Sequence, residues 1–380
     1  MKIKKLKIVT VVGTRPEIIR LSEVMKELDR TMEQIIVHTG QNYDYELSEV
    51  FFKELGIRKP DYFLGATGKN ATDTVGKIIS AVDEVLEKEK PDAFLVLGDT
   101  NSCMAAYSAK RRKIPIFHME AGNRSFDFRV PEEVNRRVID HLSDMNLTYS
   151  ELARHHLLRE GLPADRIIKT GSPMHEVLMA NIKKIQSSKI LKDLGIQKEK
   201  YFVLTAHREE NIDIPENFAR LIKIIESVSE MYKMPIIFSC HPRTRKRIEE
   251  QKIALPKTAK MMKPMGLFEF VHLEMNALCV LSDSGTISEE SSILNFPALN
   301  LREAHERPEA MDEASVIMTG LNPERVLQSL EIVKNQPRGL KRDFRIPEEY
   351  IYPNVSKKVA RIILSYTDYV RRKVWLDFSE

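Results

Sequence analysis

Two glutamates stand among arginines in one short part of the chain. Glu120 lies in the segment His118–Arg124, and Glu132 lies in the segment Pro131–Arg136. Carboxylates close to guanidinium groups can move protons beside a bound phosphate. An acidic residue directly after an apolar run, as at Glu120, is unexpected for a purely structural position. For Glu132 the simpler alternative is a favourable charge in the first turn of a helix.

Two more polar residues follow apolar runs. Asp99 comes after the run Ala93–Leu97, where it can cap a helix or direct a carboxylate into a site, and the local sequence leaves both open. His207 follows the run Phe202–Ala206 and begins a charged and polar stretch. A lone histidine is more often structural, but this position at a strand end favours a functional role.

Two segments have the composition of an anion site at the start of a helix. Gly13–Glu17 follows the run Ile8–Val12, and Arg15 within it can add a bidentate phosphate contact. The alternative is a tight turn with a solvated arginine. Asp283–Glu290 offers backbone and hydroxyl donors, and its alternative is an ordinary helix cap. The candidate contacts in this second segment are Ser284, Gly285, Thr286 and, for ribose hydroxyls, Glu290.

His241 and Arg307 are secondary candidates. His241 follows an apolar run, but the start of a capped basic helix explains its segment equally well. The sequence contains no GxGxxG and no Walker A motif, which argues against a nicotinamide cofactor and against an ATPase. It contains no CxxC and no His/Cys cluster with zinc-ligand spacing, so we expect no metal.

Short apolar strands must position these residues, because each motif follows one. Amphipathic stretches lie between the strands, as at Ile18–Leu28, Thr74–Glu87 and Asn217–Met231. Strands that are apolar on both faces and alternate with helices imply parallel sheets covered by helices. The sequence therefore predicts two doubly wound, Rossmann-like α/β domains. The expected strands are Ile8–Val12, Ile35–Thr39, Ala93–Leu97, Ile114–His118, Met145–Thr148 and Ile167–Thr170, then Phe202–Ala206, Pro235–Cys240, Leu278–Ser282 and Pro297–Leu301.

The domain boundary is expected near Gly171–Pro173, where turn residues precede a long polar helical region at His175–Leu194. We therefore predict an N-terminal domain at residues 1–171 and a C-terminal domain at residues 172–354. The amphipathic helix at residues 355–380 is expected to pack back on the first domain. Ligands of open parallel sheets bind outside the carboxyl ends of the strands, which predicts a cleft that both domains face.

Composition excludes several classes of protein. The 380 residues carry 59 basic and 55 acidic side chains, and no basic cluster is interleaved with aromatic residues, so we expect no nucleic-acid partner. The three cysteines, Cys103, Cys240 and Cys279, lie in or beside apolar runs and should be reduced and buried. The first apolar run is too short for a signal peptide or membrane span, which predicts a cytoplasmic protein without a membrane partner.

In this order, the motifs resemble those of the non-hydrolysing UDP-N-acetylglucosamine 2-epimerases. The most specific are Gly13–Glu17, Glu120–Arg124 with Pro131–Arg136, and Asp283–Glu290, and the resemblance extends to about Gly320. It implies an isomerase with a two-domain fold like that of the GT-B glycosyltransferases. It also implies that UDP binds mostly to the C-terminal domain, and that the enzyme is a homodimer without metal or other cofactor.

The resemblance also implies roles for individual residues. The catalytic set is Asp99, Glu120, Glu132 and His207; the three carboxylates handle the C2 proton, and the histidine stabilises the departing diphosphate. The family's lysine after the first motif is Arg20 here, which keeps the charge but not the geometry. The implied substrate and UDP contacts are Arg15, Arg20, Arg136, His241, Phe270 against the uracil, Ser284, Gly285, Thr286 in place of the family's usual glycine, Glu290 and Arg307.

Members of this family eliminate UDP to a 2-acetamido glycal and add it back with C2 protonated on the other face. The loop between Glu120 and Glu132 looks shorter than in enzymes that act on GlcNAc. With Gly40–Tyr45 and Ala121–Arg124, it is similar to the branch that makes UDP-N-acetyl-L-fucosamine for surface polysaccharides. The substrate implied is UDP-2-acetamido-2,6-dideoxy-L-talose.

Three other functions stay open on the sequence. One is the conversion of UDP-GlcNAc to UDP-ManNAc by the same chemistry. Another is a GT-B glycosyltransferase, whose UDP site looks similar, although the pair Glu120 and Glu132 favours elimination because a transferase needs only one base. The third is a regulator that binds a nucleotide sugar without catalysis.

Overall fold

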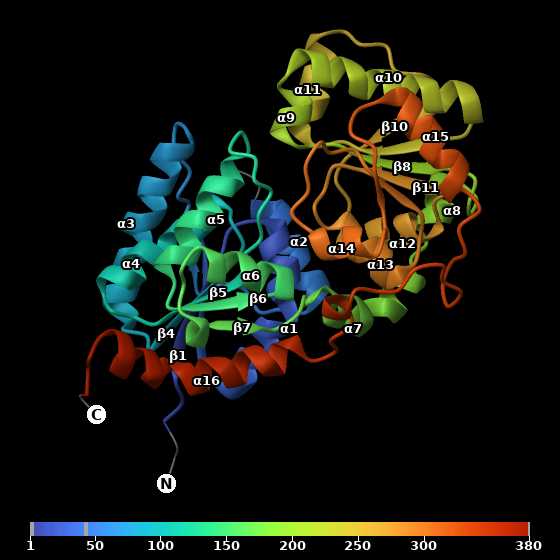
Figure 1. Cartoon of the computed structure of the whole chain (residues 1–380). Helices are drawn as coiled ribbons and strands as arrows, with labels where there is room; N and C mark the ends of the chain where they lie inside the picture. Colours follow the sequence, from blue (N-terminus) through green and yellow to red (C-terminus); the bar gives the residue numbers. More distant parts are fainter. Residues whose placement is uncertain (1–3, 42–44, 379–380) are drawn as a thin grey trace. The chain divides into compact units, whose positions relative to one another are not determined.

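The chain forms two compact units in the computed structural model, which describes residues 4–41 and 45–378. Unit 1 comprises Met1–Ala180 and Ile351–Glu380, and unit 2 comprises Asn181–Tyr350 (Figure 1). The division falls inside helix α7 (Met174–Gln186), after the turn at Gly171–Pro173 where the sequence placed it. Unit 1 is thus built from two separate stretches of the chain.

Parallel strands form the sheet of unit 1. They are β1 (Lys7–Val12), β2 (Glu33–His38), β3 (Tyr62–Phe63), β4 (Ala93–Leu97), β5 (Ile116–Ala121), β6 (Met145–Thr148) and β7 (Ile167–Lys169). Their order in the sheet is β3-β2-β1-β4-β5-β6-β7, and neighbours pair in parallel. The order changes direction between β1 and β4, which is the topological switch point of a doubly wound sheet.

The sheet of unit 2 repeats this plan. Its strands are β8 (Phe202–Thr205), β9 (Ile236–Ser239), β10 (Ala259–Met262), β11 (Cys279–Ser282), β12 (Ala298–Asn300) and β13 (Ile317–Met318). They lie in the order β10-β9-β8-β11-β12-β13, again in parallel, with the switch point between β8 and β11. The predicted fold class, two doubly wound α/β domains, is confirmed.

Helices connect the strands in both units. In unit 1 they are α1 (Arg15–Thr31), α2 (Tyr45–Leu55), α3 (Ala71–Glu89), α4 (Ala106–Arg111), α5 (Pro131–Leu142), α6 (Glu151–Arg159), the first part of α7, and α16 (Val355–Val374). In unit 2 they are α8 (Ile190–Leu194), α9 (Glu209–Ile212), α10 (Pro215–Tyr232), α11 (Pro242–Glu250), α12 (Leu267–Asn276), α13 (Ile287–Leu294), α14 (Pro308–Asp312) and α15 (Pro323–Val333). Short 3-10 helices occur at Asn101–Ala105, Ala164–Arg166 and Glu348–Tyr350.

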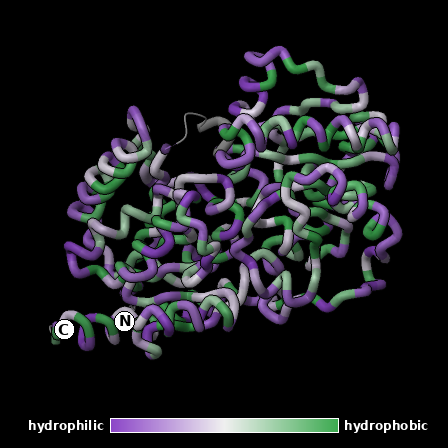
Figure 2. Tube along the Cα trace, turned by 45° about the horizontal axis from the view of Figure 1, so that its top comes forward, coloured by the Kyte–Doolittle hydropathy of each residue, from purple (hydrophilic) through white to green (hydrophobic). Residues whose placement is uncertain are grey.

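The strands form where apolar residues are buried on both faces of a sheet. All five residues of β4 are buried, and alternate residues such as Phe94 and Val96 pack against α3, α4 and α5. In unit 2, Phe202 and Leu204 likewise pack into a core with α10, α11 and α15. Fully burying such a side chain contributes about 1.5–3 kcal/mol. Figure 2 shows hydrophobic segments in the interior of each unit and helices in which hydrophilic and hydrophobic residues alternate.

Edge strands and one helix differ from the expectation. The sequence missed β3, β10 and β13, which lie at sheet edges and expose part of their residues, so they lack a long apolar run. The single helical region expected at His175–Leu194 is interrupted, because α7 ends at Gln186 and α8 starts at Ile190. Helix α16 packs along α1, as Figure 1 shows, and belongs to unit 1.

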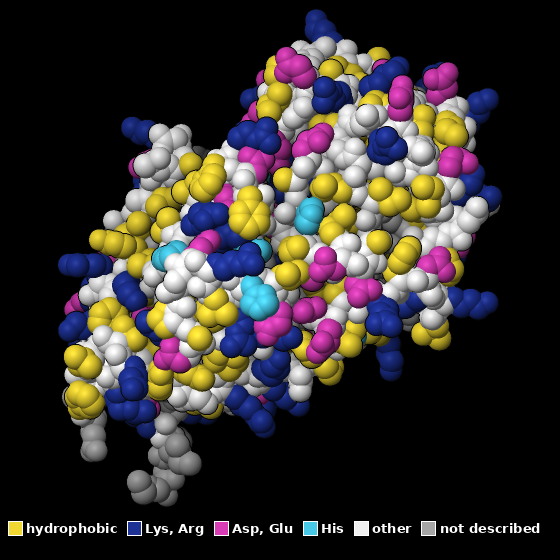
Figure 3. Space-filling view, in the orientation of Figure 1, with side chains coloured by type: hydrophobic (Ala, Val, Ile, Leu, Met, Phe, Trp, Pro, Cys, Tyr) yellow, Lys and Arg dark blue, Asp and Glu magenta, His cyan; other side chains and the backbone are white. Residues whose placement is uncertain are grey.

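The surface and the cysteines agree with the composition. On the face shown in Figure 3, acidic and basic side chains occur among one another. All three cysteines are buried and free of disulfide bonds. No helix in the described parts of the chain is both long and apolar enough to cross a membrane.

The switch point of each sheet carries candidate residues. In unit 1 the segment starting at Gly13 follows β1, and Asp99 follows β4. In unit 2 His207 follows β8, and Asp283 directly follows β11. Because ligands of open parallel sheets bind outside the carboxyl ends at the switch point, both units present a ligand-binding edge there.

Candidate active site

Glu120 lies at an irregular point of β5. The pairing of β5 with β6 shifts register between Met119 and Ala121, and Glu120 has φ 69°, which is rare for a residue other than glycine. Backbone strain of this kind costs about 1–3 kcal/mol and is concentrated at functional sites. The next turn needs glycine, because at Gly122 φ is +81° and a Cβ would meet the carbonyl oxygen of Ala153 at 2.3 Å.

Arg20 holds the Glu120 carboxylate. Its NH1 lies 2.9 Å from Glu120 Oε2, and only 4% of the Arg20 side chain and 13% of the Glu120 side chain are exposed. The guanidinium also lies 5.8 Å from the ring of the buried Tyr149. An ion pair with so little solvent is screened weakly, so Arg20 fixes the position of the Glu120 side chain.

A second arginine–carboxylate pair follows β4. Arg136 of α5 donates to Asp99 Oδ2 from Nε at 3.0 Å and from NH2 at 2.5 Å. The neighbouring Asn135 donates to the Asp99 carbonyl oxygen at 2.9 Å. The Asp99 side chain therefore accepts hydrogen bonds from a buried arginine and does not cap the following 3-10 helix. The residue that caps this helix is Thr100, through its side chain.

Helix α5 also places Glu132, in its first turn and half-buried. The buried face of this helix is charged. Glu133, Arg136 and Asp140 are buried, and Val134 and Val138 are 48% and 47% exposed. Because this departs from the usual amphipathic pattern, the helix orients buried charges within unit 1 in addition to packing Ile139 into the core.

The turn after β1 differs from the expectation of an open anion site. Glu17 Oε2 accepts from the backbone N–H groups of Gly13 at 2.6 Å and Thr14 at 2.7 Å. Glu17 Oε1 accepts from the Thr100 hydroxyl at 2.5 Å, next to Asp99. Burial raises the pKa of Glu17, and the Thr100 hydroxyl and these N–H groups offset part of that effect. A carboxylate thus occupies the donors that the sequence assigned to a phosphate.

Arg15 is the first residue of α1 and is half-buried. Its guanidinium carbon lies 6.0 Å from the centre of the Phe51 ring. Burial lowers the pKa of Arg15. The structure therefore supports a partly desolvated arginine beside the turn, rather than the solvated arginine of the structural alternative.

In unit 2 the buried Asp283 organises the strand ends. It accepts from the backbone N–H of His207 at 2.9 Å, from that of Arg208 at 3.0 Å and from the Asn211 side chain at 3.2 Å. Its Oδ1 also lies 3.3 Å from His207 Nδ1. The His207 side chain is 42% exposed, so its ring is oriented by Asp283 and still open to a ligand.

Hydroxyl groups cluster in the turn after β11. The Ser284 and Thr286 hydroxyls lie 3.0 Å apart, and Thr286 donates to Glu290 Oε2 at 3.2 Å. Gly285 is tightly enclosed, because a Cβ there would lie 2.5 Å from Glu306 Oε1. The structure therefore brings Ser284, Gly285, Thr286 and Glu290 together at the start of α13, as the sequence predicted.

Arg307 starts the short helix α14 and is buried. Its NH2 lies 3.5 Å from Glu289 Oε2, and Glu289 is fully buried. Nearby, Glu306 contacts Arg302 at 3.2 Å and Arg208 at 3.5 Å. Arg307 thus belongs to a dense set of ion pairs at the carboxyl edge of the second sheet.

Two candidates have weaker structural support. His241 is the N-cap of α11, where its Nδ1 accepts from the Arg243 backbone N–H at 3.3 Å, which fits the structural alternative. Arg243 itself bonds to Glu209 and Asp213. Phe270 is half-buried on α12.

Sequence reasoning gave no role to several buried charged residues. Glu17 belongs to a recognised motif, and its capping role was detectable, because Thr14 and Glu17 have the three-residue spacing of a capping box. Asp140 and Glu160 lie within or at the end of helices, not at strand ends. A detectable signal was present in α5, because Glu133, Arg136 and Asp140 share one helical face by their spacing.

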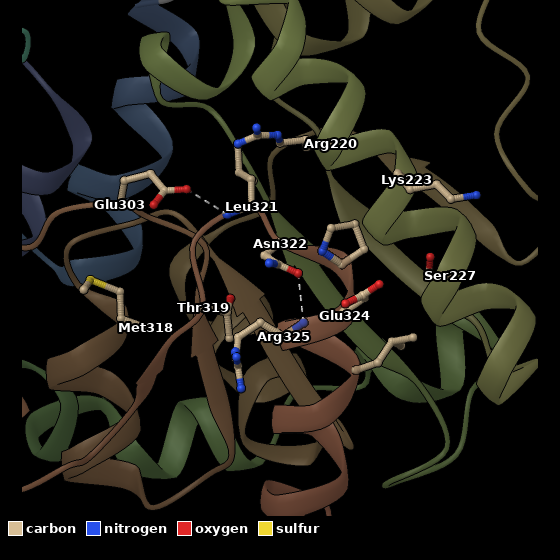
Figure 4. Close-up of a pocket in the computed structure, with 12 residues that line it drawn as sticks. Arg220, Lys223, Ser227, Glu303, Met318, Thr319, Leu321, Asn322, Glu324 and Arg325 are labelled. Atoms are coloured by element: carbon tan, nitrogen blue, oxygen red, sulfur yellow. Dashed lines mark hydrogen bonds between the residues drawn. The ribbon is translucent and has the colours of Figure 1, made fainter.

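A separate groove of about 920 Å³ lies in unit 2 (Figure 4). Its wall includes Arg220 and Lys223 of α10 and the start of α15, which Asn322 caps. No candidate residue lines it, so the groove does not belong to the candidate site. Among the described residues, no group of three or more His, Cys, Asp or Glu side chains has a geometry that can hold a metal ion.

Known proteins share the fold and much of the sequence of this chain. Residues 26–364 match the family model described as UDP-N-acetylglucosamine 2-epimerase. The solved UDP-N-acetylglucosamine 2-epimerase of Rickettsia bellii is 50% identical, with 98% of this chain and 100% of that chain covered and a TM-score of 0.92. The Methanocaldococcus jannaschii UDP-GlcNAc 2-epimerase, solved with UDP-GlcNAc and UDP, is 36% identical over 95% of this chain and 100% of that one, with a TM-score of 0.88.

A related enzyme acts on a different sugar. The UDP-2,3-diacetamido-2,3-dideoxy-D-glucuronate 2-epimerase of Pseudomonas aeruginosa is 35% identical over 85% of this chain and 91% of its own length. The matched proteins share C2 epimerisation of a UDP-linked sugar, and the sugar differs. The chain belongs to the UDP-N-acetylglucosamine 2-epimerase family and is a UDP-sugar 2-epimerase with a GT-B-like fold.

Proposed function

We propose that the epimerisation proceeds by elimination of UDP and its re-addition. In the first step a carboxylate takes the C2 proton while the bond between C1 and the UDP oxygen breaks, which leaves a 2-acetamido glycal. In the second step C2 receives a proton on the other face and UDP adds to C1. Asp99, Glu120 and Glu132 handle the proton in this scheme.

The observation that carries the proposal is the pairing of two carboxylates with buried arginines after adjacent strands. Asp99 accepts from Arg136, and Glu120 lies against Arg20, after β4 and in β5 respectively. Two proton-handling groups are what inversion needs, because the proton leaves one face of C2 and returns to the other.

Unit 2 supplies the contacts to the departing UDP in this proposal. His207 is oriented by Asp283 and stabilises the negative charge on the diphosphate. Ser284 and Thr286 donate hydroxyls, and Glu290 accepts from the ribose. The UDP complex of the M. jannaschii relative supports a nucleotide site in this fold.

For the sugar, we propose UDP-2-acetamido-2,6-dideoxy-L-talose, epimerised to UDP-N-acetyl-L-fucosamine, a precursor of surface polysaccharide. The support is the sequence of Ala121–Arg124 and the short loop that follows, in which Glu133 accepts from Ser125 N at 2.9 Å. The Gly40–Tyr45 segment adds to this, although its residues 42–44 lie outside the described part of the chain. The alternative is UDP-GlcNAc, which is favoured by the names of the R. bellii and M. jannaschii relatives.

One assay separates these possibilities. The protein is given UDP-GlcNAc and the 6-deoxy-L-talose nucleotide in parallel in deuterium oxide, and products are followed by NMR. Deuterium at C2 of an inverted sugar that still carries UDP is the expected result, and the faster substrate identifies the branch. Free UDP without an inverted nucleotide sugar would point instead to hydrolysis or transfer.

We further propose that the enzyme is a homodimer. The support is an apolar set of exposed side chains in unit 1, Tyr107, Val134 and Val138, which are 50%, 48% and 47% exposed. Helices α4 and α5, which carry these residues, lie against each other, and contiguous exposed apolar patches mark protein interfaces. Sedimentation equilibrium of the wild type and of Val134→Gln tests this, because the variant should dissociate more readily.

A further inference from the structure

Asp140 is a fully buried carboxylate that the proposed reaction does not use. It lies in α5, beyond Glu132 and Arg136, and its side chain is 0% exposed. Its Oδ2 accepts from the Gly122 backbone N–H at 3.2 Å and from Arg124 NH1 at 2.7 Å. Gly122 is two residues after Glu120, so Asp140 fixes the turn that gives Glu120 its left-handed backbone.

His118 extends this contact to the loop of Asp99. Its Nε2 lies 2.9 Å from the carbonyl oxygen of Gly98, and because a carbonyl oxygen only accepts, Nε2 donates. On the other side of the ring, Nδ1 lies 2.9 Å from Asp140 Oδ1, a contact without hydrogen-bond geometry. The fully buried His118 therefore stands between the peptide before Asp99 and the carboxylate that fixes the Glu120 turn.

Arg124 anchors the same group to α6. It donates from NH2 to Glu160 Oε2 at 2.6 Å, and Glu160 also accepts from Arg137 of α5 at 3.0 Å. Burial opposes the charge on Arg124, but Glu160 and Asp140 raise its pKa. Arg124 thus ties the Asp140 carboxylate to Glu160 at the end of α6.

We propose that His118 and Asp140 are positioning residues that set the spacing of the three proton-handling carboxylates. Asp140 holds the turn of Glu120, His118 holds the loop of Asp99, and α5, which carries Asp140, also carries Glu132. This inference rests on the proposed elimination mechanism. A misplacement of about 1 Å in such a set lowers turnover on the order of 100-fold.

The mechanism gives a readout that a structural role would not change. After elimination, the glycal and UDP are held until C2 is protonated and UDP returns. Displaced carboxylates slow that protonation, so more glycal and UDP escape per turnover. A variant that is merely less stable contains fewer active molecules, and each active molecule releases the same fraction of UDP.

Asp140→Asn is the main test, and Asp144→Asn is its matched control. Asp144 is also buried; it accepts from Ile116 N at 3.0 Å and pairs with Lys110, at the opposite end of strand β5. We expect Asp140→Asn to lower kcat on the order of 100-fold. The ratio of free UDP to inverted sugar should rise, and UDP affinity should stay within about twofold. Asp144→Asn should change stability alone.

A second pair of variants covers the case in which Asp140→Asn does not fold. His118→Leu removes the donor to Gly98, and His118→Gln keeps an amide donor near the Nε2 position. We expect His118→Leu to lower kcat and raise UDP release, and His118→Gln to restore part of both.

The outcomes separate the two proposals. If the wild type exchanges deuterium at C2 but Asp140→Asn matches Asp144→Asn in kcat and in UDP release, the positioning role is wrong and the elimination mechanism stands. The same holds if His118→Leu and His118→Gln are indistinguishable from the wild type. If the wild type inverts C2 without deuterium exchange, the elimination mechanism itself fails.

Discussion

The strand ends that carry the catalytic candidates are built differently in the two units. After β4 and in β5 of unit 1, the carboxylates of Asp99 and Glu120 lie against buried arginines. After β8 and β11 of unit 2, one buried carboxylate, Asp283, accepts three donors and leaves His207 largely exposed. The same strand plan thus holds two candidate carboxylates against arginines in unit 1 and leaves a candidate imidazole partly exposed in unit 2.

This difference shows how one fold divides a reaction. Proton transfer needs groups whose charge and distance are set before the substrate arrives, and buried ion pairs provide that. Binding a diphosphate needs hydroxyl, backbone and imidazole groups that can turn toward it. Changes in unit 1 should therefore alter turnover, and changes in unit 2 should alter nucleotide affinity.

The largest effect is expected from Glu120→Gln. The amide cannot take or give the C2 proton, so turnover should fall by a factor on the order of 10² to 10⁴. UDP affinity, measured by titration calorimetry, should stay close to that of the wild type, because Glu120 is not among the proposed UDP contacts. Unchanged turnover would remove Glu120 from the mechanism, and a large loss of UDP affinity would break the division between the units.

Acid should weaken unit 1 through His38, which ends β2. Burial lowers the pKa of His38 from 6.5 to about 4, and its ring stacks against Phe63 at 5.0 Å. The unfolded state then binds the proton first, so this contribution to stability is complete above pH 6.5 and is lost as pH falls toward 4. The loss amounts to about 3 kcal/mol.

His38→Asn isolates this contribution. In the wild type, His38 Nδ1 accepts a hydrogen bond from the Gly40 backbone N–H at 3.0 Å. The side-chain oxygen of the asparagine can accept the same hydrogen bond in the variant. We expect the variant to be less stable at pH 7, because the ring packing is lost, but to lose less stability than the wild type between pH 6.5 and 4. Parallel acid dependences in urea denaturation would show that His38 is not buried as a neutral ring.

Ser284→Ala should have a moderate effect on binding. The hydroxyl lies 3.0 Å from that of Thr286 in the turn after β11, where we place the diphosphate. The loss of one hydrogen bond costs about 1 kcal/mol, so the Kd for UDP should rise about fivefold. Ser227→Ala, in the groove of unit 2, is the matched control and should leave the Kd unchanged. Equal affinities in both variants would move the nucleotide site elsewhere.

The smallest effect is expected from His241→Asn. His241 caps α11 through its own side chain, and asparagine is a good N-cap residue. Stability should change by less than about 0.5 kcal/mol and UDP affinity by less than about twofold. A tenfold loss of affinity would instead make His241 a UDP contact and extend the ligand-binding edge of unit 2 to β9.

The central strands were predictable from the sequence, and the edges were not. The predicted bounds of β4 and β6 agree with the structure because these strands are buried on both faces. Strand β3 has two residues, one of which is exposed, so it has no apolar run to detect. Tertiary pairing alone makes it a strand.

For the site, strand ends were a good guide and helix faces were not. Asp99, Glu120 and His207 were chosen because each ends or follows an apolar run, and the fold places all three at carboxyl edges of sheets. The arginine partners could not be predicted in this way. Arg136 is 37 residues from Asp99 and Arg20 is 100 residues from Glu120, and local sequence patterns do not encode contacts over such separations. The role of Glu17 is different, because its bonds to the Gly13 and Thr14 backbone are local and follow the spacing of a capping box.

The origin of unit 1 from two stretches of chain affects how the protein emerges from the ribosome. Helix α16 completes unit 1 through contacts such as Arg371 with Asp92 at 3.0 Å and Lys358 with the Thr170 carbonyl oxygen at 2.7 Å. It is synthesised after the whole of unit 2. Until α16 is synthesised, the face of α1 that packs against it stays exposed. Unit 2 is one continuous stretch of chain and can already fold at that stage. Domains usually fold in the order in which they are synthesised. In this chain unit 1 begins first, but unit 2 is complete before unit 1 is.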